Sequence, residues 1–281
     1  MSTHLTSARA PTLTRRERQR LATYDEIILT ARDLLRREEE VSVRGVAAAM
    51  GLTPPALYRY VDGHAGLLEL VTRRIFADVV AEMEAARDRY PPEDPAAGVV
   101  GGATAFRRWA LAHPAEFRMV FTSMPGSRGS EPAPALSPAS PSSPSAHRSG
   151  EGNRQPGSEL FSDFFGEMFL RLWAQQPFAV PGPEDLDESY LAMCRDHPCP
   201  GRERELLESL GDQGPGMLWL FKQCWARLFG IVALEVFGHI EAELIDTGTM
   251  FTAMMLESGR ALGIDGEWDR LRAIARAEAA L

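Results

Sequence analysis

The stretch SVRGVAAAMGLTPPALYRYV, residues 42–61, decides how the first part of this chain is expected to fold. Ser42 can cap a short helix over Val43–Met50, because its hydroxyl can accept a hydrogen bond from a free backbone N–H of the first turn. Gly51 suits a turn, and Thr53 followed by proline is typical of the start of a further helix. Two short helices joined by a glycine-containing turn form a helix-turn-helix motif.

A helical pattern precedes this motif. Apolar residues such as Ile27, Ala31 and Leu34 follow a helical stripe within residues 15–40, with charges on the other face. The helix could start at Thr14 or at Thr23, since each has a glutamate three residues later and so matches the capping box. We predict a start at Thr23, with a basic arm before it over about residues 1–22.

A longer helix follows the motif, from about Asp62 to Arg89, and consecutive prolines end it. Beyond it the chain shows helical spacing only, with no strand pattern. The helices are predicted over Ala103–Phe121 (with a bend at His113-Pro114), Glu159–Gln176, Gly216–His239 and Gly248–Leu262, and a short one around Arg202–Leu210. We therefore predict an all-α fold, in which a three-helix helix-turn-helix domain (residues 1–75) precedes a larger helical bundle (residues 76–281).

One segment lacks the residues that make a core. Residues 125–158 consist almost entirely of Ser, Pro, Gly, Ala, Glu and Arg, with Leu136 as the one large aliphatic residue. Such a composition buries too little apolar surface to offset the entropy of ordering. The sequence predicts a disordered insertion that can be deleted without loss of the fold.

The charge distribution and the composition indicate where the protein acts and what it can bind. The net charge is −9, but the first 75 residues hold 12 Arg against 9 acidic residues, so the basic excess lies at the front. No run approaches the roughly 20 apolar residues of a membrane-spanning helix, and the N-terminus lacks the apolar core of a signal peptide. With only three cysteines, we expect a cytoplasmic protein without disulfides and without contact with a membrane.

Residues 42–61, together with the preceding helix and Leu67-Leu68, resemble the DNA-binding domain of TetR-family repressors. The rest is similar to the WHG type of TetR C-terminal domain, through Trp225, Gly230, Leu234-Glu235 and Gly238-His239. The resemblance implies a DNA-binding repressor that a small apolar effector releases from its operator. The chain departs from the family at residues 38–40, three glutamates where a glycine is usual, and at His64, where a lysine is usual.

The resemblance also implies which residues contact DNA. The start of a recognition helix lies near base edges, and flanking hydroxyls and cations hold phosphates. The residues expected near the bases are Thr53, Pro54, Pro55, Ala56 and Arg59, and those near the backbone are Ser42, Arg44, Tyr58, Tyr60 and His64. Taken singly, each could equally be a cap, a packing residue or a solvated charge. Arg44 and Arg59 are the candidates for a guanine edge.

The second domain is rich in aromatic residues, which suit a core first and an effector cavity second. The candidate cavity residues are Trp109, Phe117, Phe121, Phe165, Phe169, Trp173 and Trp225. The helices Gly216–His239 and Gly248–Leu262 are apolar around much of their circumference, which predicts a homodimer joined by a four-helix bundle. A two-fold dimer would bind a near-palindromic operator in double-stranded DNA.

Other chemistry is poorly supported. Cys194, His197 and Cys199 could ligate a metal, but their spacing matches no common zinc pattern, so a structural loop is the better interpretation. Phosphate-binding glycine motifs, a nucleophile elbow and an H-E-x-x-H motif are missing from the sequence, which leaves an enzyme as a distant alternative and predicts no cofactor. A closer alternative is that the C-terminal helices recruit a protein partner instead of a small molecule.

Overall fold

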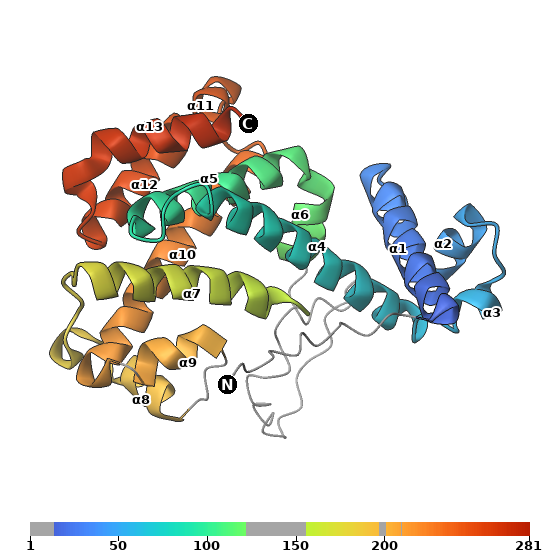
Figure 1. Ribbon diagram of the computed structural model, residues 1–281, viewed down its shortest axis with the longest axis horizontal. Helices are drawn as coiled ribbons and strands as arrows, with labels where there is room; N and C mark the ends of the chain where they lie inside the picture. Colours follow the sequence, from blue (N-terminus) through green and yellow to red (C-terminus); the bar gives the residue numbers. More distant parts are fainter. Residues whose placement is uncertain (1–13, 122–155, 197–200, 209) are drawn as a thin grey trace, which may run out of the picture. The chain divides into compact units, whose positions relative to one another are not determined.

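The computed structural model describes residues 14–121, 156–196, 201–208 and 210–281. Within those ranges every regular element is helical, so the predicted all-α fold is confirmed (Figure 1). The chain divides into two compact units, Met1–Val71 and Thr72–Leu281. The boundary predicted at residue 75 falls near this division, inside a helix that begins in the first unit and continues into the second.

The first unit contains α1 (Arg15–Arg36), α2 (Val43–Ala49), α3 (Pro54–Leu57) and the beginning of α4 (Gly63–Arg87). Helix α2 packs against both α1 and α3. The buried side chains that join these helices are Ile27, Ile28, Ala31, Leu34, Val43, Val46, Ala47, Leu57 and Val61. Their spacing is that of the apolar stripes in the sequence.

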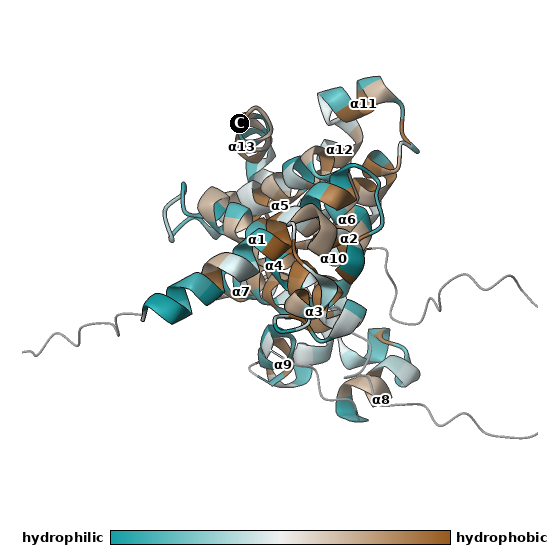
Figure 2. Ribbon diagram, turned by 90° about the vertical axis from the view of Figure 1, so that its right-hand side faces the viewer, coloured by the Kyte–Doolittle hydropathy of each residue, from teal (hydrophilic) through white to brown (hydrophobic). Residues whose placement is uncertain are grey.

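The start of α1 corrects one prediction. A complete capping box lies at Thr14, whose Oγ1 accepts from the Glu17 backbone N at 3.2 Å while its own backbone N donates to Glu17 Oε2 at 2.7 Å. Thr23 lies inside the helix, and its hydroxyl donates to the Gln19 carbonyl at 3.0 Å. Residues 15–20 therefore form hydrophilic helical turns instead of an arm, as Figure 2 shows at the beginning of α1. Residues 1–13 of the predicted arm lie outside the described residues.

The turn after α1 carries the first departure from the TetR pattern. Glu38 has a φ of 58°, in the left-handed region where glycine is preferred. The Glu38 and Glu39 backbone N–H groups donate to the carbonyls of Leu35 and Leu34 at 3.1 and 3.0 Å, which is the Schellman arrangement. The helix thus ends in a turn of the kind that glycine usually forms, although the residue is Glu38. A residue with a Cβ loses about 1–2 kcal/mol of stability in this left-handed conformation.

The second unit contains the rest of α4 and the remaining helices. These are α5 (Pro95–Ala112), α6 (Pro114–Phe121), α7 (Ser158–Gln175), α8 (Glu188–Asp196), α9 (Gly201–Glu208), α10 (Gly214–Val236), α11 (Ala242–Thr247), α12 (Thr249–Ala261) and α13 (Trp268–Ala279). The predicted bend at His113-Pro114 is the break between α5 and α6. In space α5 lies beside α13, α7 beside α9, and α10 beside α9 and α12 (Figure 1).

Helix α5 begins earlier than predicted, at Pro95 instead of Ala103. The Asp94 side chain caps it, accepting from the Ala97 backbone N at 3.1 Å. Residues 95–107 are buried without interruption, and small residues predominate among them. A helix buried on all sides has no polar face, so its sequence lacks the periodic apolar stripe from which helices were predicted.

The end of the predicted insertion also needs correction. Most of it lies outside the described residues, but Ser158 begins α7 and Gly157 is buried with a φ of 91°. A Cβ on Gly157 would lie 3.2 Å from both Arg73 Cα and Phe76 Cβ, closer than ordinary packing allows. Gly157 is therefore part of the packed second unit, and a deletion of the insertion should end at residue 155.

Helix α10 is mainly apolar, and twelve of its residues are buried. Within the described chain, the stretch Gly211–Val236 is the one helical segment long and apolar enough to cross a membrane by length and composition. This corrects the expectation that no run approaches that length. Core helices of ordinary domains have the same composition.

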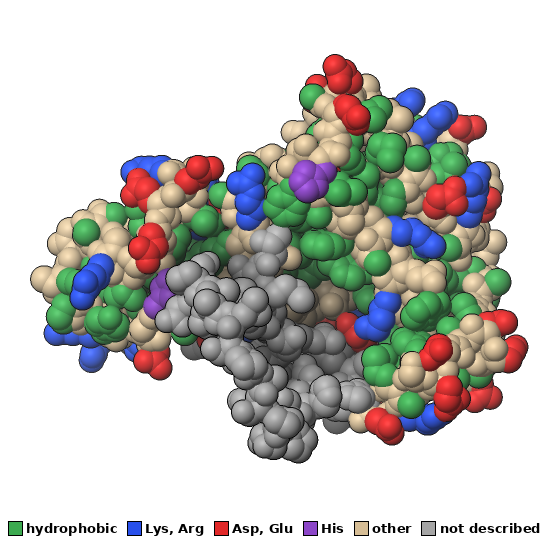
Figure 3. All heavy atoms as spheres, turned by 180° about the vertical axis from the view of Figure 1, so that it is seen from behind, with side chains coloured by type: hydrophobic (Ala, Val, Ile, Leu, Met, Phe, Trp, Pro, Cys, Tyr) green, Lys and Arg blue, Asp and Glu red, His purple; other side chains and the backbone are tan. Residues whose placement is uncertain are grey.

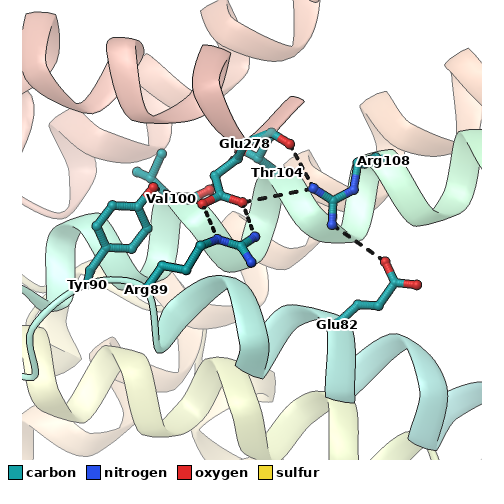
Figure 4. A network of polar contacts seen from close by, with 7 residues as sticks. All are labelled: Glu82, Arg89, Tyr90, Val100, Thr104, Arg108 and Glu278. Carbon is teal, nitrogen blue, oxygen red and sulfur yellow. Dashed lines mark hydrogen bonds and ion pairs between the residues drawn. The ribbon is translucent and has the colours of Figure 1, made fainter. Parts of the chain in front are cut away.

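Helix α13, which the sequence analysis did not predict, is held by the carboxylate of Glu278 (Figure 4). Arg89 Nε and Tyr90 Oη each donate to Glu278 Oε1 at 2.9 Å, and Arg108 Nη1 donates to the Glu278 carbonyl at 2.8 Å. Burial alone would raise the pKa of Glu278, but the hydrogen bonds from Arg89 and Tyr90 outweigh it and lower this pKa. Burial and the bond to Glu278 raise the pKa of Tyr90 to about 12, so its phenol stays a donor.

Candidate DNA interface and ligand cavity

The turn between α2 and α3 has the geometry of the predicted helix-turn-helix. Ser42 Oγ accepts from the Gly45 backbone N at 3.1 Å and caps α2, as predicted. At the other end, the Gly51 and Leu52 N–H groups donate to the Ala48 and Ala47 carbonyls at 3.1 and 2.8 Å. Gly51 has a φ of 67° and open space around its Cβ position, so the backbone conformation is what requires glycine there.

Helix α3 starts at Pro54 behind Thr53, as predicted, although the Thr53 side chain makes no capping hydrogen bond. Turns continue past Leu57, since the Tyr60 and Val61 N–H groups donate to its carbonyl at 2.9 and 3.2 Å. Leu57 and Val61 are buried, while Tyr58 and Arg59 are exposed. The segment is thus amphipathic, with one side free to face a partner.

The predicted DNA-contact residues divide by exposure. Those exposed are Arg44, Thr53, Pro55, Tyr58, Arg59 and His64, and those half-buried are Ser42, Pro54, Ala56 and Tyr60. Pro55, Tyr58 and Arg59 follow helical spacing of three and four residues, so they share one side of the α3 segment. All ten belong to the first unit and lie within or directly beside α2, α3 and the beginning of α4.

Tyr60 has a packing role besides any contact with DNA. Its ring lies edge-on against the ring of Tyr24 on α1, with centroids 5.4 Å apart. Arg20 Nη2 donates to Tyr24 Oη at 3.3 Å. This cluster connects α1 to the end of the α3 segment, which makes Tyr60 less accessible than Tyr58.

Charged side chains of both signs are interspersed on the face seen in Figure 3. No group of three His, Cys, Asp or Glu side chains within the described ranges could hold a metal ion. Cys194 is half-buried on α8, and its suggested co-ligands His197 and Cys199 lie outside the described residues. The metal hypothesis gains no support from the geometry.

The second unit contains a cavity of about 440 Å³ between α5, α7, α10 and α12. This volume lies in the range of small-molecule sites. Most of the wall is apolar, and aromatic rings predominate. The aromatic lining residues are Phe76, Phe121, Phe161, Phe165, Phe169, Phe221, Trp225 and Phe229. The polar lining residues are Ser158, Ser162, Glu203, Lys222, Cys224 and Ser258, and burial raises the pKa of the Cys224 thiol.

Four of the seven candidate cavity residues line this cavity, namely Phe121, Phe165, Phe169 and Trp225. The other three do not. Trp109 and Phe117 are fully buried core residues, with Phe117 packed against the rings of Phe106 and Phe121. Trp173 packs edge-on against Phe178 at the end of α7, with centroids 5.1 Å apart.

Sequence reasoning missed Phe161, Phe221 and Phe229 as lining residues, although it had placed all three on predicted helices. It also missed the charged pair Glu203 and Lys222, whose Oε2 and Nζ atoms lie 3.1 Å apart. The one signal in the sequence was Lys222, a single lysine within the mainly apolar helix α10. Glu203 is on a short helix, where nothing in the sequence indicates burial.

Comparison with known proteins gives distant relatives. No protein-family model matches the chain. The HTH-type transcriptional regulators Rv1816 of Mycobacterium tuberculosis (strain H37Rv) and Mb1846 of Mycobacterium bovis are each 23% identical over 214 residues, covering 76% of this chain and 80% of the relative. The crystal structure of SCO4313, a protein described as regulatory, aligns with a TM-score of 0.57 at 21% identity, covering 87% of this chain and 98% of that one. The structural likeness concerns the fold.

Proposed function

We propose that this chain is a cytoplasmic DNA-binding transcriptional regulator of the TetR type, a repressor that a small apolar effector releases from its operator. The observation that supports this proposal most is that the α3 segment, which follows the Gly51 turn, leaves one side exposed. The naming of the mycobacterial relatives as HTH-type transcriptional regulators supports it.

The chemistry of the exposed residues assigns them different tasks. Pro54, Pro55 and Ala56 have no side-chain hydrogen bonds to offer, so they can only make apolar contact with a thymine methyl. The guanidinium groups of Arg44 and Arg59 can donate two bonds to a guanine edge. The exposed hydroxyl of Tyr58 can donate to a phosphate, which positions the protein without reading sequence.

Single substitutions test these roles. Tyr58→Phe should weaken binding to all DNA about equally, because it removes one phosphate bond. If Arg59 or Arg44 reads a guanine, its replacement by Ala should cost about 1–3 kcal/mol of binding and relax preference at one position per half-site. If it holds a phosphate, affinity should fall for every DNA sequence. The slope of log K against log salt concentration should then become shallower by roughly 0.9. Salt titrations on specific and random duplexes separate these outcomes.

The matched control is Arg195→Ala, which removes an exposed arginine from α8 in the second unit. It should change neither affinity nor salt slope. Unchanged binding in all three interface variants, with the fold intact by circular dichroism, would refute the assignment of α3 as the recognition helix.

We also propose that the regulator is a homodimer joined through α10 and α12. Leu234 on α10, Phe237 directly after α10 and Met250 on α12 are 44, 37 and 44% exposed in the single chain. Large apolar side chains exposed together on two packed helices are typical of a surface that a second subunit covers.

A charge placed on that face should separate the subunits. We expect the unaltered protein to have twice the 31.0 kDa chain mass in size-exclusion chromatography with light scattering. Leu234→Glu should give the monomer mass, because an unpaired carboxylate would be buried at the interface. Leu160→Glu is the control, since Leu160 on α7 is 42% exposed. A monomeric unaltered protein at micromolar concentration would disprove the dimer.

A further inference from the structure

We infer that the ligand of the cavity in the second unit is a neutral, mainly aromatic molecule carrying one hydrogen-bond acceptor, such as a carbonyl oxygen, for the Lys222 ammonium group. This rests on the proposed function in that the cavity is taken as the effector site. It adds the chemical class of the effector.

The aromatic part follows from the wall of the cavity. The ring of Phe161 lies 4.8 Å from that of Trp225 and 5.2 Å from that of Phe165, and Trp225 lies 5.4 Å from Phe229. Rings packed at these distances favour edge-to-face and offset contacts with a further ring. A flat apolar body therefore suits this wall.

The neutral charge follows from the two charged residues of the lining. Glu203 and Lys222 are the only formally charged side chains among the described residues that line the cavity, and they form an ion pair at 3.1 Å. The pair balances its own charge. A charged ligand would lose its hydration in a mostly apolar cavity without gaining a counter-charge, which is costly.

The hydrogen-bond acceptor follows from the difference between the two partners. The Glu203 side chain is 6% exposed and that of Lys222 is 39% exposed, so the ammonium is the accessible member of the pair. An ammonium group has three N–H donors, and Glu203 accepts from one of them. A carbonyl oxygen on the ligand can accept from another without disturbing the ion pair.

Ligands of either charge fit less well. A carboxylate on Lys222 would lie beside the buried Glu203 carboxylate, and like charges at such distances repel. An amine on Glu203 would lie beside the Lys222 ammonium group, which repels it in the same way. A neutral acceptor avoids both repulsions, and a bond to a charged donor is stronger than one between neutral groups.

Naphthalene probes substituted at the same ring position test this class. Acetylnaphthalene, naphthoate, naphthylmethylamine and ethylnaphthalene share one aromatic body and differ in charge and acceptor. In isothermal titration calorimetry of the full chain, we expect acetylnaphthalene to bind about tenfold or more tightly than the others, as one bond to a charged donor would give. Lys222→Met should reduce its affinity to that of ethylnaphthalene, whose own binding should not change. Lys222→Arg keeps a donor and should retain the preference.

The opposite results are equally clear. Tighter binding of naphthoate or naphthylmethylamine would overturn the neutral class, and equal binding of acetylnaphthalene and ethylnaphthalene would overturn the role of Lys222. Binding of no probe would overturn the cavity as a site for this class. DNA binding is measured separately by fluorescence anisotropy, so a chain that binds acetylnaphthalene but no DNA contradicts the proposed function and leaves the ligand class standing.

Discussion

Replacing Glu235 by Leu is expected to lower the free energy of unfolding by about 3–5 kcal/mol, because it leaves the buried Arg107 guanidinium without its carboxylate. The two side chains are 0 and 8% exposed, and Arg107 Nε and Nη2 donate to Glu235 at 2.6 and 3.1 Å. Arg107 Nη2 also donates to the Ile245 carbonyl at 2.5 Å. Arg107 cannot lose its proton, so its charge would be left with the Ile245 carbonyl and the Phe251 ring, whose centroid lies 5.2 Å from the guanidinium carbon.

Removing both partners should cost far less. Burial raises the pKa of Glu235 in spite of the Arg107 hydrogen bonds, so desolvation outweighs attraction in this pair. Arg107→Met combined with Glu235→Leu should therefore return to within about 1 kcal/mol of the unaltered protein. Urea unfolding followed by circular dichroism measures all three variants. Additive losses in the double variant would show that the two residues are not coupled.

The second large effect is expected at Glu278. Glu278→Gln should lower the free energy of unfolding at neutral pH by about 2–3 kcal/mol, since a 2% exposed carboxylate with charge-assisted bonds becomes a neutral amide. The loss is smaller than at Glu235, because Arg89 is 40% exposed and water can solvate it.

Acidification should remove this difference. The folded pKa of Glu278 lies below its ordinary value of 4.5, so its stabilisation is complete above that value and is lost as the pH falls through the folded pKa. The stabilities of the two proteins should therefore stay apart at and above pH 4.5 and converge as the pH falls through the lowered pKa of Glu278. A difference that stays constant down to pH 2 would mean that packing of the side chain, and not its charge, holds α13.

The sequence predicted those elements whose signals are local. A cap, a glycine turn and a hydrophobic stripe define α2 and α3, and the structure has both where they were expected. The choice between Thr14 and Thr23 failed because both match the same capping motif. Helix α13 was missed although Leu271, Ala275 and Glu278 follow helical spacing, since one of the three buried positions is an acid that only distant arginines can stabilise.

The cavity shows the same limit. Phe117 and Phe121 lie one helical turn apart on α6, yet one is core and the other lines the cavity. That difference depends on how α7 and α10 pack against α6, which no local pattern records. Lys222 acquires its role only through Glu203, which lies 19 positions away in the sequence on another helix.

Selection of bound fragments from a pool of random DNA tests the central claim most directly. The full chain, confirmed as folded, is incubated with the pool at fixed salt, and the retained fragments are sequenced. DNA binding by a two-fold dimer predicts enrichment of a near-palindrome with half-sites about 10 base pairs or somewhat more apart. Enrichment should disappear in the combined variant Arg44→Ala, Arg59→Ala. If the folded protein retains no sequence above the starting pool at low salt, the claim that it is a sequence-specific DNA-binding regulator is contradicted.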